Sequence, residues 1–152
     1  MTHIRHRFFG IPAYIDCMPA SGHPVILFDG QCNLCNASVR FVVRRDPKEH
    51  FRFASLQSAT GQALLQKHGL KNDLNTIVLV QEEHAWTHSS AALRIARRLT
   101  AAWPILALFL VLPPFLRDPV YRFIAKRRYR WFGQSEACPL PDPAQQHLFL
   151  DT

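Results

Sequence analysis

Two cysteines separated by two residues follow a short apolar run, and this arrangement constrains the fold more than any other feature of the chain. The apolar run Val25–Phe28 leads through Asp29 and Gly30 to Cys32 and Cys35, and helical periodicity follows. This order predicts a buried strand that turns into a helix, with the cysteines on its first turn. The helix dipole and unpaired amides stabilise a negative sulfur there, and two cysteines three apart can close a disulfide. We therefore expect a redox pair.

Length and composition predict one globular domain in a reducing compartment. The chain has 152 residues, of which 48% are hydrophobic, and this is enough for a core. Four cysteines are too few for a disulfide-stapled secreted scaffold. Pro12, Asp16 and Pro19 interrupt the first 20 residues, which hold no apolar core of signal-peptide length. These features predict a cytoplasmic location.

The net charge of +7 comes mainly from arginine, and much of it is clustered. Such clusters can meet nucleic acid, an anionic membrane surface or an acidic protein, but more often they are the solvated face of a helix. We favour the solvated face, do not expect nucleic acid as a partner, and leave peripheral membrane contact open. The two clusters are Arg94, Arg97 and Arg98, and Arg117, Arg122, Lys126, Arg127, Arg128 and Arg130.

Periodicity along the chain predicts a β-α-β-α-β-β-α core over residues 24–100, after an N-terminal extension over residues 1–23. Two strand–helix units followed by a hairpin and a closing helix indicate an α/β sheet with helices on both faces. Strands are expected over residues 25–28, 51–54, 76–80 and 85–88, and helices over residues 36–45 and 60–68 and from Ser89 or Ser90 to Leu99.

Residues 101–152 are predicted to form a helical addition packed on the same domain. One helix is expected from Pro104 to Leu112, and a second, capped by Asp118 and begun by Pro119, through Arg128. The apolar stretch from residue 101 to residue 116 is shorter than the roughly 20 residues that span a membrane. We interpret it as a buried helix rather than a membrane-surface contact. Trp131 and Phe132 are expected to pin these helices to the sheet.

The helical pattern after the cysteines also predicts their exposure. Cys35, Val39 and Val42 share one face of the helix, with Arg40 and Arg44 on another. We therefore expect Cys35 to point inward and Cys32, one turn earlier, to stay accessible.

Together these residues resemble the DCC family of predicted thiol–disulfide oxidoreductases, named after an Asp-x-x-Cys-x-x-Cys motif. Asp29, Cys32 and Cys35 match that motif, and the resemblance covers about residues 25 to 150. It implies a thioredoxin-like fold. Thioredoxins carry a cis-proline before the third strand, whereas Asn75 and Thr76 stand here, so a Thr76 hydroxyl contact is an alternative means of docking substrate. Further matches are Val39–Val42, Arg52–Ala54, Ser89–Leu93, Tyr129–Gly133 and Cys138.

The expected activity is dithiol–disulfide exchange without a bound cofactor. Cys32 would attack a substrate disulfide as a thiolate, its pKa lowered by the helix N-terminus, and Cys35 would resolve the mixed disulfide. The partners would be a disulfide-containing protein or a low-molecular-weight thiol, and a reducing partner. Zinc binding completed by Cys17, Cys138 and a histidine, or two inert thiols, are the alternatives at the cysteines.

Two further alternatives concern the motif aspartate and the chain as a whole. Asp29 either takes a proton from Cys35, which needs an elevated pKa, or accepts amide hydrogen bonds that shape the loop; we favour the second role slightly. The chain as a whole is alternatively a non-catalytic binding module that recruits a protein or a membrane through its basic C-terminal helices.

Overall fold

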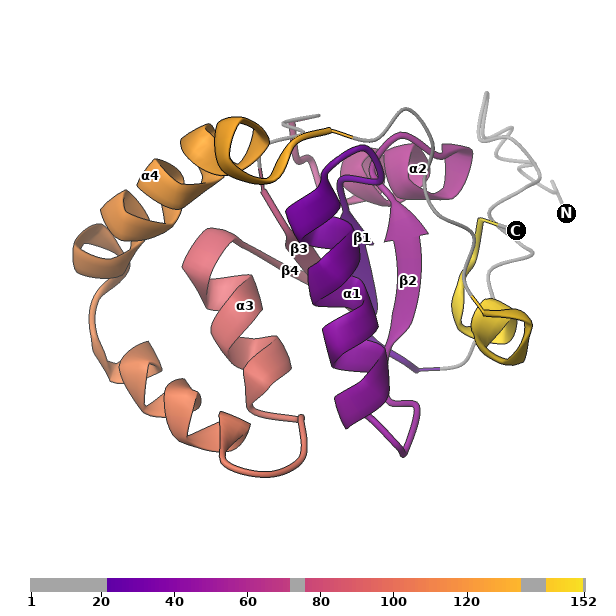
Figure 1. The fold of residues 1–152 in the computed structure, drawn as a ribbon, viewed down its shortest axis with the longest axis horizontal. Coiled ribbons are helices and arrows are strands. Elements are labelled where there is room, and N and C mark those ends of the chain that lie inside the picture. The colour runs from indigo at the N-terminus through magenta and orange to yellow at the C-terminus, as the bar shows by residue number, and fades with distance from the viewer. Residues whose placement is uncertain (1–21, 72–75, 135–141, 152) are drawn as a thin grey trace, which may run out of the picture.

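The computed structural model describes residues 22–71, 76–134 and 142–151, and it centres on a four-stranded mixed sheet (Figure 1). The strand order is β2-β1-β3-β4, in which β1 pairs parallel with β2 and antiparallel with β3, and β3 pairs antiparallel with β4. The predicted β-α-β-α-β-β-α order and thioredoxin-like α/β fold are confirmed. The strands are β1 (Val25–Phe28), β2 (Arg52–Ser55), β3 (Val78–Gln81) and β4 (His84–Thr87).

Alternate strand residues point to two separate cores, because successive side chains leave a strand on opposite faces. Ile26 and Phe28 of β1 belong to the core on one face, together with residues of α1 (Asn33–Arg45) and α3 (His88–Ala96). Leu27 belongs to the core on the other face, which α2 (Ala59–Lys67) covers. Figure 1 shows α1 and α3 side by side in front of the sheet. The sheet is thus covered on both faces, as predicted.

Local signals explain the limits of α1 and α2. The Cys32 side chain caps α1, which therefore begins three residues earlier than predicted. The helix ends at Arg45, with Asp46 in the C-terminal cap position, because a residue before proline avoids helical geometry. An Asp46 side-chain oxygen accepts the Phe51 amide at 3.1 Å and closes the loop into β2. Ser58 caps α2 by accepting the Gly61 amide at 3.0 Å.

Some predicted boundaries are shifted by a few residues. Strand β3 begins at Val78 rather than Thr76, and α3 follows β4 directly, with Thr87 in the cap position and Ala96 as its last residue. Neither Ser89 nor Ser90 caps α3. The Ser89 hydroxyl instead donates to Asp118, which lies on the helix packed against α3.

The prediction of a helix that begins at Asp118-Pro119 is wrong. A single helix α4 runs over Pro114–Phe132, with Pro113 in the cap position and Pro119 inside the helix. Proline fits the first helical position because its missing amide would have no helical partner there. Pro114 takes this position, five residues before Pro119, which was predicted to take it. The Tyr129–Phe132 segment continues the helix, and Gly133, at φ 75°, ends it.

The prediction of a buried apolar helix over residues 101–116 is also wrong. Here η2 (Trp103–Val111) is a 3₁₀ helix with no buried residue, and it and α4 form an arc around α3 (Figure 1). Trp131 and Phe132, expected to pin the helices to the sheet, are about half exposed, at 52% and 49%. Among the described residues, no helix combines the length and apolar character needed to cross a bilayer.

The C-terminal residues return to the outer edge of the sheet after η3 (Pro143–Leu148). The Leu150 amide donates to the Phe53 carbonyl at 2.8 Å, and the Phe149 ring stacks on Phe53 at 5.3 Å between ring centroids. This contact covers part of the free edge of β2, which would otherwise offer unpaired backbone groups. The boundaries at residues 23 and 100 remain predictions, and most of the predicted extension lies outside the described residues.

We predict that Gly61→Ala destabilises the protein, although alanine normally stabilises a helix interior by about 1 kcal/mol relative to glycine. A Cβ atom at Gly61 would overlap the Ser55 backbone carbonyl, which cannot move without disturbing β2. The expected loss in the free energy of unfolding is about 1–3 kcal/mol in urea titration. Gln66→Ala on the exposed side of the same helix is the control and should stay within about 0.5 kcal/mol. A Gly61→Ala protein as stable as the parent would contradict this packing.

Candidate functional site

The turn from β1 into α1 is shaped by hydrogen bonds from its own polar residues. The Asp29 carbonyl accepts the Cys32 amide at 3.2 Å, and Asp29 Oδ1 accepts the Gln31 amide at 3.0 Å. The buried Asn36 side chain donates to the Gly30 carbonyl at 2.9 Å from the second turn of α1. The loop-shaping role considered for Asp29 is therefore present in the structure. A role in proton transfer stays a prediction.

The two cysteines lie at the N-terminus of α1, but the prediction of their exposure is wrong. Cys32 is completely buried and Cys35 is partly exposed. Cys32 stands in the cap position outside the helix, where it forms a β-bridge with Gln134 just after α4. Its Sγ accepts the Cys35 amide at 3.4 Å. Periodicity within α1 cannot anticipate the burial of Cys32, because a distant part of the chain causes it.

A buried ion pair joins the turn to α4. Arg128 Nη2 donates to Asp29 Oδ2 at 2.8 Å, and both side chains are almost fully buried. The same carboxylate also accepts bonds from the Tyr129 hydroxyl and, at 2.7 Å, from the Gln57 side chain. Asp29 is thus held by donors from two distant parts of the chain, α4 and the segment between β2 and α2. The interpretation of Arg128 as part of a solvated basic face is wrong.

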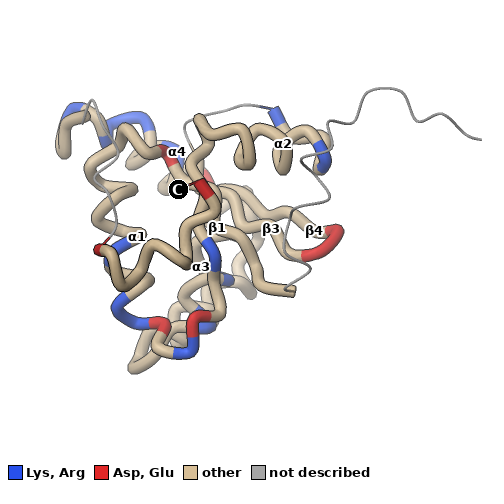
Figure 2. Tube along the Cα trace, turned by 90° about the vertical axis from the view of Figure 1, so that its right-hand side faces the viewer, with Lys and Arg blue, Asp and Glu red and all other residues tan. Residues whose placement is uncertain are grey.

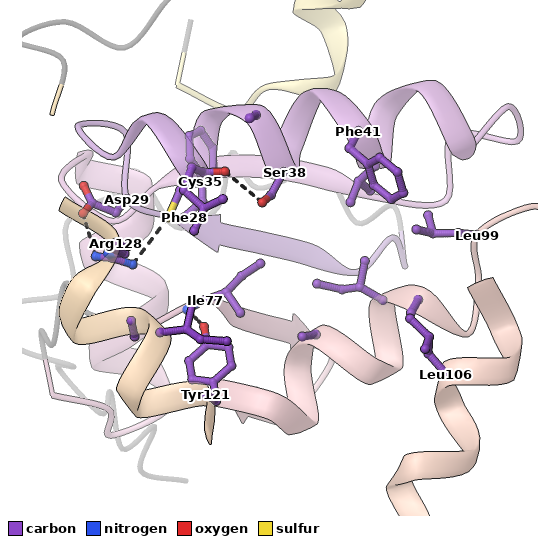
Figure 3. Close-up of a pocket in the computed structure, with 18 of the residues that line it drawn as sticks. Phe28, Asp29, Cys35, Ser38, Phe41, Ile77, Leu99, Leu106, Tyr121 and Arg128 are labelled. Carbon is purple, nitrogen blue, oxygen red and sulfur yellow. Dashed lines mark hydrogen bonds and ion pairs between the residues drawn. The ribbon is translucent and has the colours of Figure 1, made fainter. Parts of the chain in front are cut away.

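Arg128 also reaches the second cysteine. Its Nη1 donates to Cys35 Sγ at 3.4 Å, as Figure 3 shows. Burial and the adjacent Cys32 thiol raise the pKa of Cys35 to about 12, while the Arg128 charge lowers it in part. Burial alone would lower the pKa of Arg128, but Cys35 and the Tyr129 hydroxyl outweigh it, and the net pKa is raised. The site therefore places a permanent positive charge against a thiol that stays protonated near neutral pH.

A pocket of about 630 Å³ opens beside Cys35, between α1, α3 and α4. Its walls are apolar apart from a few groups, and Cys35, Asp29 and Arg128 lie together at one end, as seen in Figure 3. Leu106 of η2 lies at the other end. Along the wall the Tyr121 hydroxyl accepts the Ile77 amide at 3.1 Å, and burial raises the pKa of Tyr121. Such a pocket suits an apolar group held next to the Cys35 sulfur.

Thr76 does not line this pocket. Its buried hydroxyl accepts the His88 amide at 2.9 Å and donates to the Ile77 carbonyl at 3.2 Å, so it joins the start of α3 to the segment before β3. A contact between this hydroxyl and substrate stays a prediction. Asn75 lies outside the described residues, among which there is no cis peptide bond.

Sequence reasoning found Asp29, Cys32 and Cys35, and the structure brings all three together. It missed the groups that surround them, which are Arg128, Tyr129 and Gln57. The sequence contained a signal for Arg128. Tyr121, Ala125 and Arg128 are spaced four and three residues apart, so they share one face of a helix, and the first two of them carry no charge. Cys17 and Cys138 lie outside the described residues, within which no three metal-ligating side chains gather.

The amino-acid sequence of the chain is similar to those of two known proteins. The chain is 46% identical over 127 residues to "Uncharacterized protein YuxK" of Bacillus subtilis, covering 83% of this chain and 93% of that protein. It is 41% identical over 119 residues to "DCC family protein At1g52590, chloroplastic" of Arabidopsis thaliana, covering 77% and 69% of the two chains. No solved structure matches it.

The family profile described as DCC1-like thiol-disulfide oxidoreductase matches residues 26–134. This range includes all of β1 after its first residue, both motif cysteines and the whole of α4 with Arg128. The chain therefore belongs to the DCC1-like thiol-disulfide oxidoreductase family.

Proposed function

We propose that the protein catalyses thiol–disulfide exchange through Cys32 and Cys35. The observation that carries this proposal is the arrangement of the pair at the N-terminus of α1. There the Cys32 sulfur accepts a backbone amide, and the Arg128 guanidinium donates to the Cys35 sulfur. Amide donors and a fixed positive charge both favour sulfur in its anionic form. Family membership supports the same chemistry.

The exchange begins with the Cys32 thiolate, which attacks one sulfur of a substrate disulfide. A mixed disulfide forms, and the other substrate sulfur leaves as a thiolate. Cys35 then transfers its proton to that thiolate or to water and attacks the Cys32 sulfur. The bond between Cys32 and the substrate breaks, and the second substrate sulfur leaves as a thiolate, which takes a proton from water. The products are a Cys32–Cys35 disulfide and a substrate reduced by two electrons. A dithiol reductant restores the cysteine pair.

The surroundings of the two sulfurs divide these roles between them. With a pKa of about 12, Cys35 stays protonated and does not compete as the first nucleophile near neutral pH. When it loses its proton during resolution, the adjacent guanidinium of Arg128 stabilises the new thiolate. Asp29 holds that guanidinium in place, so we assign it a positioning role.

Access to Cys32 requires a local opening at the end of α4. Gln134 bridges to Cys32, and the Asn33 side chain donates to the Phe132 carbonyl at 3.0 Å, which fixes the last turn of α4 on the start of α1. Separation of these two helix ends uncovers the sulfur. A substrate that carries an apolar group beside its disulfide would use the adjacent pocket. We propose a protein disulfide or a low-molecular-weight disulfide of this kind.

Single-cysteine variants test the assignment of the nucleophile. In Cys35→Ser the mixed disulfide with a substrate should accumulate on Cys32, because no second thiol remains to resolve it. In Cys32→Ser little adduct should form near neutral pH, because Cys35 is protonated. In this Cys32→Ser variant the rate of Cys35 alkylation by iodoacetamide should rise about tenfold per pH unit between pH 7 and about 10. The reason is that the thiolate fraction of Cys35 rises about tenfold per pH unit below its pKa. Mass spectrometry locates each adduct.

An adduct on Cys35 alone would reverse the two roles, and a parent protein that forms no Cys32–Cys35 disulfide in glutathione buffers would overturn the proposed function. The binding-module alternative would then gain support.

The buried ion pair gives a second prediction, measured by urea unfolding. Arg128→Leu should lower the free energy of unfolding by about 3–5 kcal/mol, because it leaves the buried Asp29 carboxylate without its cation. Arg127→Leu is a matched control at the preceding position, which is exposed, and it should change stability by about 0.5 kcal/mol or less. Adding Asp29→Asn to Arg128→Leu should recover part of the loss. Equal effects of Arg127→Leu and Arg128→Leu would contradict the pair.

The opening that exposes Cys32 gives a third prediction. Asn33→Ala removes the side-chain bond to the Phe132 carbonyl, so Cys32 alkylation should become several-fold faster; a lost hydrogen bond of about 1 kcal/mol corresponds to about fivefold. Ser38→Ala, which removes a side-chain bond to the Leu34 carbonyl within α1, is the control and should leave the rate unchanged. If both variants react at the parent rate, the end of α4 does not control access.

A further inference from the structure

The exposed apolar side chains of this protein gather on one part of the chain. Among the described residues, every exposed large hydrophobic side chain lies between Ile105 and Phe132, on η2, α4 and the link between them. We call this set the apolar surface. It consists of Ile105, Leu106, Leu108, Phe109, Val111, Leu112, Phe115, Leu116, Val120, Phe123, Ile124, Trp131 and Phe132.

The apolar surface is most exposed along η2. Residues three apart on a 3₁₀ helix stand almost above one another, so Ile105, Leu108 and Val111 form a ridge. Their exposed fractions are 68%, 72% and 81%, and Phe115 at the start of α4 is 72% exposed. Large apolar side chains gain free energy when they leave water, and these four remain in it. A gathering of exposed apolar side chains on one part of a protein marks a docking site.

Basic residues lie directly beside the apolar surface. Arg122, Lys126, Arg127 and Arg130 are exposed on α4, whose lysines and arginines are among the blue segments of Figure 2. The Arg127 guanidinium lies over the Phe123 ring, 4.3 Å from its centroid. Phe123 in turn meets Trp131 edge to face at 6.1 Å, so cationic and aromatic groups share one face of the helix.

The segment that carries the apolar surface has almost no acidic side chains. Between residues 101 and 134 the sequence contains a single acidic residue, Asp118, which accepts a hydrogen bond from Ser89. The occupant of the surface must therefore be apolar at its centre and negatively charged at its border. A second copy of this chain meets only the first condition, because it would bring the basic residues of both α4 helices together.

We propose that the apolar surface docks on an anionic lipid bilayer. The ridge of η2 and the adjoining aromatic side chains would enter the boundary between headgroups and acyl chains, as interfacial helices with a basic border do. The arginines and Lys126 would meet lipid phosphates, and Trp131 would lie at headgroup depth. Leu106 and Ile124 belong both to this surface and to the pocket beside Cys35, so docking places the pocket next to the lipid. The docking itself does not depend on the proposed thiol chemistry.

Flotation of the purified protein with vesicles tests this proposal. The protein should float with phosphatidylcholine vesicles that contain phosphatidylglycerol, bind phosphatidylcholine alone at least about tenfold more weakly, and lose affinity as salt screens the headgroups. Leu108→Asp combined with Val111→Asp should abolish binding while leaving the far-ultraviolet circular dichroism spectrum unchanged, because both side chains are exposed.

Charge reversal supplies a matched pair of variants. Lys126→Glu with Arg127→Glu should weaken binding to anionic vesicles by about tenfold or more, since each basic residue near the surface contributes about 1 kcal/mol. Lys67→Glu with Lys71→Glu changes the net charge equally on and just after α2, which covers the opposite face of the sheet, and should have much less effect.

Three results would overturn the proposal. The first is equal binding to vesicles with and without phosphatidylglycerol, and the second is an equal loss of binding in the two charge-reversed variants. The third is a dimer in light scattering that does not bind vesicles and that Leu108→Asp with Val111→Asp dissociates, which would assign the apolar surface to a second copy of the chain.

Discussion

The ion pair between Asp29 and Arg128 joins the turn after β1 to the last turns of α4, across 99 positions of sequence. A buried ion pair adds little net stability compared with an apolar pair of the same shape, but losing one partner leaves an uncompensated charge in the interior. The turn after β1 and the last turns of α4 therefore depend on one another for stability. The second donor nitrogen of the same guanidinium meets Cys35, so the pair that closes the fold also sets the electrostatics of the cysteines.

The unequal environments of the two cysteines follow from that closure. Cys32 receives a backbone amide and is covered where Gln134 bridges to it, whereas Cys35 borders an apolar pocket with its thiol protonated. A pair of thiols with identical surroundings would have no preferred order of reaction. Here burial, a fixed cation and a covering segment distinguish the two thiols, and the proposed roles of attack and resolution are assigned from this difference. The segment that covers Cys32 lies directly after α4, whose last turn is bonded to the start of α1.

The rest of the chain distributes apolar residues in two different ways. Residues of the strands, α1, α2 and α3 alternate with the period of their element and fill the two cores, so their pattern predicted the sheet and its covering helices. The residues of η2 are apolar on every side and carry no periodic information about which side is buried. Length and composition predicted burial for them, yet the sheet face available to η2 is already occupied by α1 and α3, and the apolar surface stays outside.

The sequence by itself determined the element order, the thioredoxin-like fold, the turn that carries Asp29 and the position of the cysteine pair. These depend on local patterns: strand alternation, helix caps and the spacing of two cysteines along a few residues. Tertiary structure alone decided which thiol is covered, that Arg128 is buried, that Asp118 bonds to Ser89 and that η2 stays exposed. Each of those outcomes depends on which distant segment comes to rest against the site. The packing of whole helices and strands determines this, and a short stretch of sequence carries no information about it.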